Sequence, residues 1–271
     1  MILLLGNGLG GSIASLHLIS QKSCSLFNNV IIQSGSAFDK VINMQEAVRR
    51  TKVLAQLVGC DYKFDHAKMV DCLRKIDPQV LINQEQSVSN YSLNMEPFPP
   101  VIDSQFIIED PKTMLENKVF KKCPMMIGTN ANEGLSDMIE YIPELGLQEN
   151  LFELDENQLD SGMARMFKDL SSPILNLVKF QYGILNEGDG SKAAKVKRFF
   201  GLQSALADKQ VICHVDKMAK IFADDANQVN DKTWTRLIKY VESNFRFLST
   251  CSILLMTIYL LPKRPIYLVN H

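Results

Sequence analysis

The chain has 271 residues, of which 46% are hydrophobic and 22% charged, a balance typical of a globular protein with one sizeable domain or two small ones. Its formal net charge of −1 gives no broad positive field of the kind that gathers nucleic acid or anionic lipid, so no nucleic-acid partner is predicted. The six cysteines include no C-x-x-C pair and no histidine at zinc-ligand spacing, which argues against a structural metal site.

The first elements read as strand, sharp turn, helix and strand. Residues 1–5 are a short apolar run, typical of a buried strand, that a cluster of glycines stops, and residues 12–20 repeat apolar side chains at helical spacing. Residues 26–33 end in a β-branched run typical of a fully buried strand. This β-α-β order predicts a parallel sheet.

The middle of the chain predicts two helices and a third strand. Apolar residues recur with a period near 3.6 over 44–58, just before a glycine suited to a helix end, and a second helix is expected over 66–75. Residues 125–128 predict another buried strand, and the polar turn 129–134 follows at its carboxyl end. In parallel sheets, sites are built at that end of the strands.

The second half of the chain is expected to be mostly helical from 140 to 210, with an amphipathic helix over 192–206. Residues 245–261 then form an apolar run, shorter than the roughly 20 residues of a typical membrane span but followed by the basic Pro262-Lys-Arg264. This run therefore fits two interpretations, a membrane span and a buried helix or strand. Residues 266–269 look like a short strand.

Cys60 and Cys72 are the two cysteines that lie close in the sequence. A disulfide between them would close a loop of roughly a dozen residues, would stabilise the fold by about 2–3 kcal/mol and would need an oxidising compartment. Two buried free thiols in a reducing cytosol fit the spacing equally well.

The glycine turn after the first strand allows three interpretations. Gly6, Gly8 and Gly11 match G-x-G-x-x-G, the pattern of a dinucleotide loop, but no acid ends the next strand to hold a ribose, since Asp39 falls well beyond it. Gly6, Gly8 and Gly10 also match the nucleophile elbow G-x-S-x-G with glycine in place of the serine. The third interpretation is a tight strand-to-helix connection without any further role.

Several segments resemble the type-B carboxylesterase and cholinesterase family. Residues 6–36 resemble its elbow, helix and following strand, and the resemblance is good over residues 1–222 and poor in the tail. Further matching segments are 58–74, 100–103, 110–111, 127–134, 207–213 and 266–271. The resemblance implies that residues 1–271 are a partial carboxylesterase type-B domain. Its fold would be a partial α/β-hydrolase fold from the elbow strand onward, with an incomplete central sheet and a large helical content.

Within that family, the non-enzymatic neuroligins carry glycine at the serine position, in a G-S-G-I-G pattern that residues 6–10 closely resemble. This implies a non-catalytic adhesion domain of the cell surface or secretory pathway, without a cofactor, in which Gly8 and Glu133 are vestigial catalytic positions: Gly8 leaves the nucleophile position empty, and Glu133 falls on the position of the acid. It also implies a neurexin-type partner, with calcium dependence open, and candidate contacts at Glu133, Leu135, Ser136 and Asp137. Cys60 and Cys72 fall on the family's small disulfide loop.

The chain also departs from the family pattern. It begins at the elbow strand without a signal peptide or the family's oxyanion loop, and none of its four histidines, His17, His66, His214 and His271, matches the catalytic base. We therefore expect a truncated form that does not readily fold or dimerise alone; the resemblance implies a dimer built on helices, one of them near 187–206. The alternative function is a carboxylesterase-like serine hydrolase fragment whose serine was lost.

Overall fold

The structure is a computed structural model that describes residues 1–39, 41–90, 97–130, 132–147, 154–168, 170–185, 191–228 and 257–258. The chain divides into two compact units: unit 1 comprises residues 1–39 and 114–271, and unit 2 comprises residues 40–113. The strands are β1 (Leu3–Asn7), β2 (Asn29–Gln33), β3 (Ile42–Asn43), β4 (Val101–Ile102), β5 (Met125–Gly128) and β6 (Thr257–Ile258).

The α-helices are α1 (Leu9–Ile19), α2 (Met44–Leu57), α3 (His66–Leu73), α4 (Pro78–Asn90), α5 (Pro111–Glu116), α6 (Met138–Tyr141), α7 (Glu156–Met166), α8 (Ser172–Gln181), α9 (Lys192–Ala207) and α10 (Cys213–Gln228). Short 3₁₀ turns lie at Cys24–Leu26 and Pro143–Leu147, and a π-helical turn at Asp208–Ile212 joins α9 to α10. Several helices begin at a polar cap: the side chain of Asn43 accepts a hydrogen bond from Glu46 N at 2.9 Å, and Asp155 and Gln158 form a capping box.

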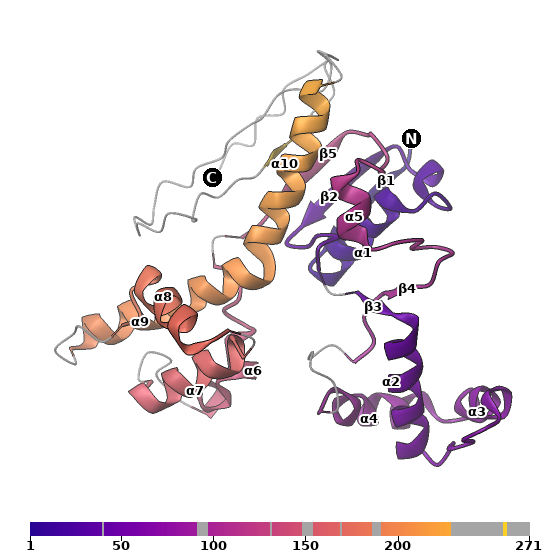
Figure 1. The fold of residues 1–271 in the computed structure, drawn as a ribbon, viewed down its shortest axis with the longest axis horizontal. Helices are drawn as coiled ribbons and strands as arrows, with labels where there is room; N and C mark the ends of the chain where they lie inside the picture. The colour runs from indigo at the N-terminus through magenta and orange to yellow at the C-terminus, as the bar shows by residue number, and fades with distance from the viewer. Residues whose placement is uncertain are drawn as a thin grey trace. The chain divides into compact units, whose positions relative to one another are not determined.

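Unit 1 is built on a sheet with the strand order β1-β2-β5-β6 (Figure 1). The first three strands are parallel, with Gly6 beside Ile32 and Gln33 beside Gly128, and β6 pairs antiparallel with β5. The predicted parallel sheet is confirmed. Because β1, β2 and β5 run in the same direction and in register, their carboxyl ends meet at one edge of the sheet, which is where such sheets hold their sites.

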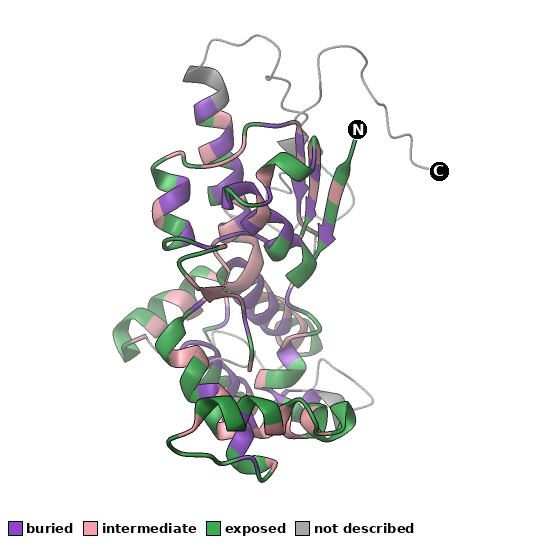
Figure 2. Cartoon of the chain, turned by 90° about the vertical axis from the view of Figure 1, so that its right-hand side faces the viewer, coloured by how far each residue is buried: buried purple, intermediate pink, exposed green. Residues whose placement is uncertain are grey.

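The centre of the sheet is buried and its β1 edge is not. Ile32 and Ile127 are fully buried, whereas Leu3 and Leu5 of β1 are 51% and 57% exposed (Figure 2). The expected burial of residues 1–5 is therefore only partly met, because among the described residues β1 has a strand neighbour on one side alone. The helix α1 packs on β1 and β2 and buries Leu18.

The helices α6, α7, α8 and α9 of unit 1 share a hydrophobic core of their own. Its buried members are Met138, Ile142, Leu145, Leu154, Leu159, Met163, Met166, Phe167, Ile184, Phe199, Leu202, Ala205 and Leu206. These side chains recur at helical spacing along α7 and α9, so each helix turns one apolar face inward. The mostly helical character predicted for residues 140–210 is confirmed wherever the structure describes them.

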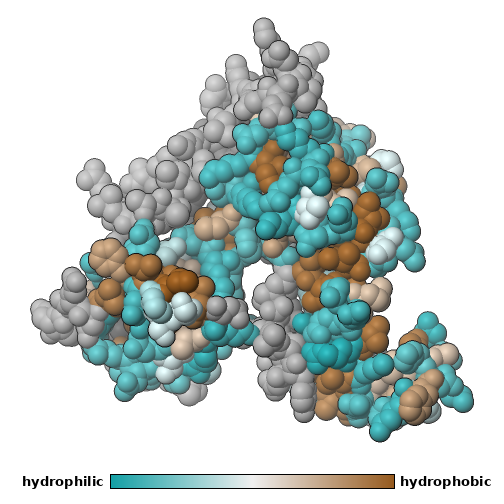
Figure 3. All heavy atoms as spheres, in the orientation of Figure 1, coloured by the Kyte–Doolittle hydropathy of each residue, from teal (hydrophilic) through white to brown (hydrophobic). Residues whose placement is uncertain are grey.

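The outer face of α8 is apolar and exposed. Ile174, Leu177 and Phe180 follow one another at intervals of three residues and are 48%, 66% and 68% exposed. Figure 3 shows a brown, hydrophobic patch in the region of α8. The helix α9, which occupies most of the range expected for a dimer helix, instead turns its large apolar side chains into the shared core. In the described part of this region, the large exposed apolar side chains thus lie on α8 rather than on α9.

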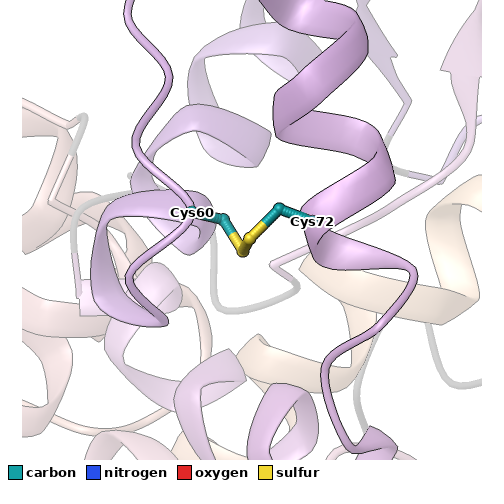
Figure 4. The surroundings of a disulfide bond; sticks show 2 residues. All are labelled: Cys60 and Cys72. Atoms are coloured by element: carbon teal, nitrogen blue, oxygen red, sulfur yellow. A yellow bond between two sulfur atoms is a disulfide. The ribbon is translucent and has the colours of Figure 1, made fainter.

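Unit 2 contains α2, α3 and α4 and the short parallel pair β3 and β4. A small core of Ala55, Cys60 and Met69 lies at its centre, and a disulfide joins Cys60 to Cys72 on α3 (Figure 4). The bridge closes the end of α2 against α3 across 12 residues. Of the two interpretations that the cysteine spacing left open, the structure supports the disulfide.

The predicted helix boundaries are close to the observed ones, with one correction at the elbow. The helix expected over 12–20 begins earlier, at Leu9, because it starts directly after the glycine at the apex of the turn. No helix of the described segments is long and apolar enough to cross a membrane. The 245–261 run lies outside the described residues except for β6, and the strand expected over 266–269 lies wholly outside them.

Candidate functional site

The turn between β1 and α1 has its apex at Gly8. This glycine has φ 55° and ψ −126°, a left-handed conformation that residues with a side chain rarely adopt. Its N–H donates a hydrogen bond of 2.8 Å to the carbonyl oxygen of Gln33, and its own carbonyl accepts one of 3.1 Å from Ser12 N. Gly8 is therefore fixed between the end of β2 and the first turn of α1, at the carboxyl edge of the sheet.

The glycines around this apex have different packing. A Cβ atom on Gly6 would lie 1.9 Å from the carbonyl oxygen of Gly10, and one on Gly35 would lie 2.3 Å from that of Gly8. By contrast, a Cβ atom on Gly8 or Gly10 would meet no atom within 4 Å. The turn thus needs glycine at Gly6 and Gly35 to bring backbones together, whereas the apex has open space where a nucleophile would stand.

Glu133 lies on the turn that follows β5, at the same edge of the sheet. Its carboxylate accepts a hydrogen bond from the hydroxyl of Ser34, the residue directly after β2, and one of 2.7 Å from Asn130 N. Ser34 has a φ of 54°, and its N–H donates to the carbonyl oxygen of Gly128 at 2.8 Å. Two of the residues singled out from the sequence, Gly8 and Glu133, are therefore both tied to the end of β2.

The Glu133 turn is also held from the side of α9. The side-chain amide of Gln203, which is 4% exposed, donates a hydrogen bond to the Glu133 carbonyl oxygen. Gly134 has φ 75°, and a Cβ atom there would lie 3.0 Å from Ala207 N, so the helix backbone passes close to this turn. Because contacts from the end of β2 and from α9 both hold this turn, its other side chains have well-defined positions.

The other residues proposed as contacts lie on the outside of this turn. Leu135 is 39% exposed, Ser136 is exposed and Asp137 is half-buried. The hydroxyl of Ser136 donates to the Asp137 carboxylate at 3.2 Å. An exposed apolar side chain between polar neighbours on a rigid turn is suited to a small contact with another protein.

The two described histidines of unit 1 make hydrogen bonds away from Glu133. His17 Nδ1 lies 2.9 Å from the Ser23 hydroxyl, and burial lowers its pKa. His214, on α10, lies 3.2 Å from the Asp39 carboxylate. Among the described residues, the Glu133 carboxylate is bonded only to Ser34 and Asn130, so no described histidine completes a Glu-His pair there; His271 lies outside the described residues.

Asp39 forms a second cluster beside the elbow, which reasoning from the sequence alone did not find. Its carboxylate accepts hydrogen bonds from the Ser12 hydroxyl of α1 and from Ser36 N at 3.0 Å, and it pairs with His214 of α10. Ser12 is 4% exposed, so its hydroxyl is committed to this cluster rather than open to solvent. The cluster joins the elbow helix to α10 directly before the chain passes into unit 2.

Of these partners, Ser34 and Asn130 had a signal in the sequence, and Asn130 belongs to the polar turn 129–134 predicted after β5. A polar residue directly after a buried strand is expected at the edge where parallel strands end, and Ser34 occupies that place. Gln203 is 70 residues away from Glu133 in the sequence, on the buried side of a helix. Within the described part of the chain, no group of three or more His, Cys, Asp or Glu side chains could hold a metal ion.

Comparisons with known proteins agree with this geometry. A family model described as "Carboxylesterase family" matches residues 1–251. Cholinesterase from Mus musculus is 29% identical over 232 residues, which make up 83% of this chain and 37% of that protein. Acetylcholinesterase from Myxine glutinosa is 29% identical over 232 residues, 84% of this chain and 67% of that protein.

Neuroligin-3 from Mus musculus is more similar over a shorter stretch. It is 38% identical over 134 residues, which make up 49% of this chain and 16% of that protein. The chain thus spans a little over a third of the length of the mouse cholinesterase and about a sixth of that of neuroligin-3.

Proposed function

The chain belongs to the carboxylesterase family, and we propose that it is a non-catalytic member whose Glu133 turn contacts a cell-surface partner of the neurexin type. The observation that carries the proposal is Gly8, which stands at the apex of an intact elbow turn and offers no nucleophile. Acyl transfer by this family's chemistry needs a hydroxyl at that apex, a base to take its proton and an acid to orient the base.

Among the described residues, the serines beside the Gly8 turn do not offer a substitute nucleophile. Ser12, the nearest serine in the sequence, is buried, and its hydroxyl bonds to Asp39. Ser34 donates its hydroxyl to Glu133. A carboxylate that accepts a hydrogen bond from a serine directly, without a histidine between them, is a poor base for that serine because carboxylic acids are much stronger acids than alcohols.

The adhesion half of the proposal rests on the turn that holds Glu133. Gln203 donates a hydrogen bond to the backbone carbonyl of Glu133 and Ser34 donates one to its carboxylate, while Leu135 and Ser136 remain exposed. A rigid surface loses less conformational entropy when it binds than a flexible one does, so the turn is suited to a contact of this kind. The higher identity to neuroligin-3 than to the cholinesterases, although over a shorter stretch, favours the same interpretation.

The Cys60–Cys72 disulfide supports a location in the secretory pathway or at the cell surface. Such bonds form and persist in oxidising compartments and are rare in the cytosol.

The proposal is tested with the full-length protein in a binding assay against an immobilised neurexin ectodomain, with calcium and with a chelator. Wild-type protein should bind, and Leu135→Asp should weaken binding at least tenfold because it places a charge in the apolar part of the contact. The matched control is Leu26→Asp, at a leucine that is 64% exposed on the Cys24–Leu26 turn, and its binding should be unchanged. Wild-type protein that shows no binding with calcium present would overturn the partner assignment.

A serine hydrolase remains the second candidate function, because the cholinesterases match over more of the chain than neuroligin-3 does, 83% against 49%. Turnover of a chromogenic acetate ester by the full-length wild-type protein, abolished by an organophosphate, would support this candidate and exclude the first.

A further inference from the structure

Three consecutive side chains of the π-helical turn between α9 and α10 each bond to the end of a different helix. The Asp208 carboxylate accepts a hydrogen bond of 2.6 Å from the hydroxyl of Tyr182, the residue directly after α8. The Lys209 ammonium donates to the carbonyl oxygen of the last residue of α7. The side-chain amide of Gln210 donates at 3.0 Å to the hydroxyl of Tyr141, the last residue of α6. Single π-helical turns often occur at functional sites.

Of the three, Gln210 holds the helix that continues the proposed contact turn. Residues 135–137 run directly into α6, where Met138 is fully buried. This segment is held at its start by Gln203, which bonds to the Glu133 carbonyl oxygen, and at its end by Gln210. The two glutamines lie seven residues apart, about two helical turns, so neighbouring turns of one helical stretch hold both ends of the contact segment.

The amide of Gln210 is kept in this place although part of it lowers stability. Its Oε1 atom is buried and has no hydrogen-bond partner among the described residues. A buried polar atom without a partner destabilises the folded state, whereas an apolar side chain of similar shape would not. Features that lower stability are found at functional sites, where the activity of the protein depends on them.

We propose that Gln210 is a positioning residue for partner binding: through Tyr141 it fixes α6 and thereby the turn that carries Leu135. It acts through Tyr141 rather than by a contact of its own. A surface that is already ordered loses less conformational entropy on binding, so this bond strengthens binding without adding a contact. The inference rests on the proposed function for the identity of the partner, whereas the ordering of the turn is a property of the free protein.

Gln210→Met in the full-length protein tests the positioning role. The variant keeps the length of the side chain but removes both the N–H that bonds to Tyr141 and the oxygen without a partner. Its affinity for the immobilised neurexin ectodomain, measured with calcium, should fall about three- to tenfold, the effect of ordering one or two side chains on binding. Its thermal unfolding temperature should stay the same or rise. A variant that loses thermal stability, or that keeps wild-type affinity, would overturn the proposal.

Hydrogen exchange of the free protein gives a second readout that needs no partner. The backbone N–H groups of Met138, Glu140 and Ile142 are hydrogen-bonded within residues 134–142 and should exchange faster in Gln210→Met than in wild type. Unchanged exchange in this segment would overturn the positioning role. Wild-type protein that does not bind neurexin would instead exclude the proposed partner, and the exchange rates would then decide the positioning of the turn.

Two further variants check that the effect passes through this one bond. Tyr141→Phe should weaken partner binding by a similar factor, and it replaces Gln210→Met as the test if that variant does not fold. The double variant should bind no more weakly than the weaker single variant, because both substitutions remove the same bond. Losses of affinity that multiply would contradict the proposal. Gln56→Met, the same change at an exposed glutamine of α2, is the matched control and should alter neither affinity nor exchange.

Discussion

The hydroxyl of Ser34 donates a hydrogen bond to the carboxylate of Glu133, which joins the end of β2 to the turn after β5. The bond spans 99 residues of sequence, and the same carboxylate also accepts one from Asn130 N at 2.7 Å. The Glu133 turn therefore depends on the strand that also anchors Gly8 through Gln33. The elbow and the proposed contact surface are consequently two parts of one edge of the sheet.

Loss of this bond should destabilise the protein measurably. In the full-length protein, Ser34→Ala should lower the free energy of unfolding by about 1–2 kcal/mol, because Glu133 loses a charge-assisted hydrogen bond. Chemical denaturation measures the change. Ser136→Ala, at an exposed serine of the same turn, is the control and should change stability by less than about 0.5 kcal/mol. Equal effects of the two variants would show that the bond contributes little.

The glycines of the elbow should differ sharply in their tolerance of alanine. Gly6→Ala and Gly35→Ala place a Cβ atom against backbone carbonyl oxygens, at 1.9 and 2.3 Å, so both should lower the yield of folded protein severely. Gly10→Ala puts a methyl group in open space on a helix and should be neutral or stabilising by up to about 1 kcal/mol. Secretion yield and thermal unfolding of the full-length variants compare them, and a Gly6→Ala protein as stable as Gly10→Ala would contradict the observed turn.

The sequence was informative where local patterns determine structure. The strands β2 and β5 lie where short apolar runs end at polar or glycine residues, because such runs are buried in a parallel sheet. The helix α4 was not predicted from the sequence, because residues 78–90 mix glutamine, asparagine and serine with few apolar positions. The one helix signal in this segment is Pro78, since proline is favoured at the first position of a helix. Local pattern thus predicted the sheet better than the polar helices.

The site was predictable only in part, for the same reason. Once β2 and β5 are parallel, with Gln33 beside Gly128, the next residues along both strands must lie near each other, which brings Ser34 close to the Glu133 turn. The contact of Gln203 with Glu133 depends on how α9 packs, and no spacing in the sequence encodes it. The pairing of Asp39 with His214, 175 residues apart, has the same origin.

The disulfide of unit 2 should make a clear contribution to stability. Replacing both cysteines, Cys60→Ala with Cys72→Ala, should lower the free energy of unfolding by about 2–4 kcal/mol, since the bond restricts the unfolded chain over a loop of 12 residues. Denaturation of wild-type protein with and without a reductant should show a loss of similar size, and the double variant should no longer respond to the reductant. Cys24→Ala, at an unpaired cysteine, is the control and should respond as the wild type does.

Glu46 should make the stability of the protein depend on pH in the acid range. Hydrogen bonds from Arg49 and Arg50 lower the pKa of Glu46 to about 2, and Arg50 is itself 2% exposed and bonded to the Pro97 carbonyl oxygen at 2.9 Å. An acid whose pKa is lowered by folding stabilises the protein above its unfolded-state pKa, and this contribution is lost as the pH falls through the folded-state value.

Glu46→Gln should therefore destabilise the protein at neutral pH, and its difference from wild type should shrink as the pH falls from the ordinary glutamate range toward about 2. Denaturant titrations at a series of pH values measure the difference. Glu109→Gln, at an exposed glutamate of the same unit, should follow the wild-type curve throughout. A difference between Glu46→Gln and wild type that stays constant with pH would show that the ion pairs with Arg49 and Arg50 are not its cause.

Restoring a serine at the elbow should not by itself create an esterase. A Cβ atom at Gly8 meets nothing within 4 Å, so Gly8→Ser fits sterically, and its positive φ should cost about 1–2 kcal/mol. The new hydroxyl would still need a base, and the described histidines of unit 1 are bonded to Ser23 and Asp39 rather than to Glu133. We expect full-length Gly8→Ser to be secreted, to keep its neurexin binding, and to hydrolyse a chromogenic acetate ester no faster than wild type. Mouse cholinesterase in the same assay is the positive control. Organophosphate-sensitive turnover by Gly8→Ser would instead mean that the full-length protein supplies the base, and that Gly8 alone keeps the site inactive.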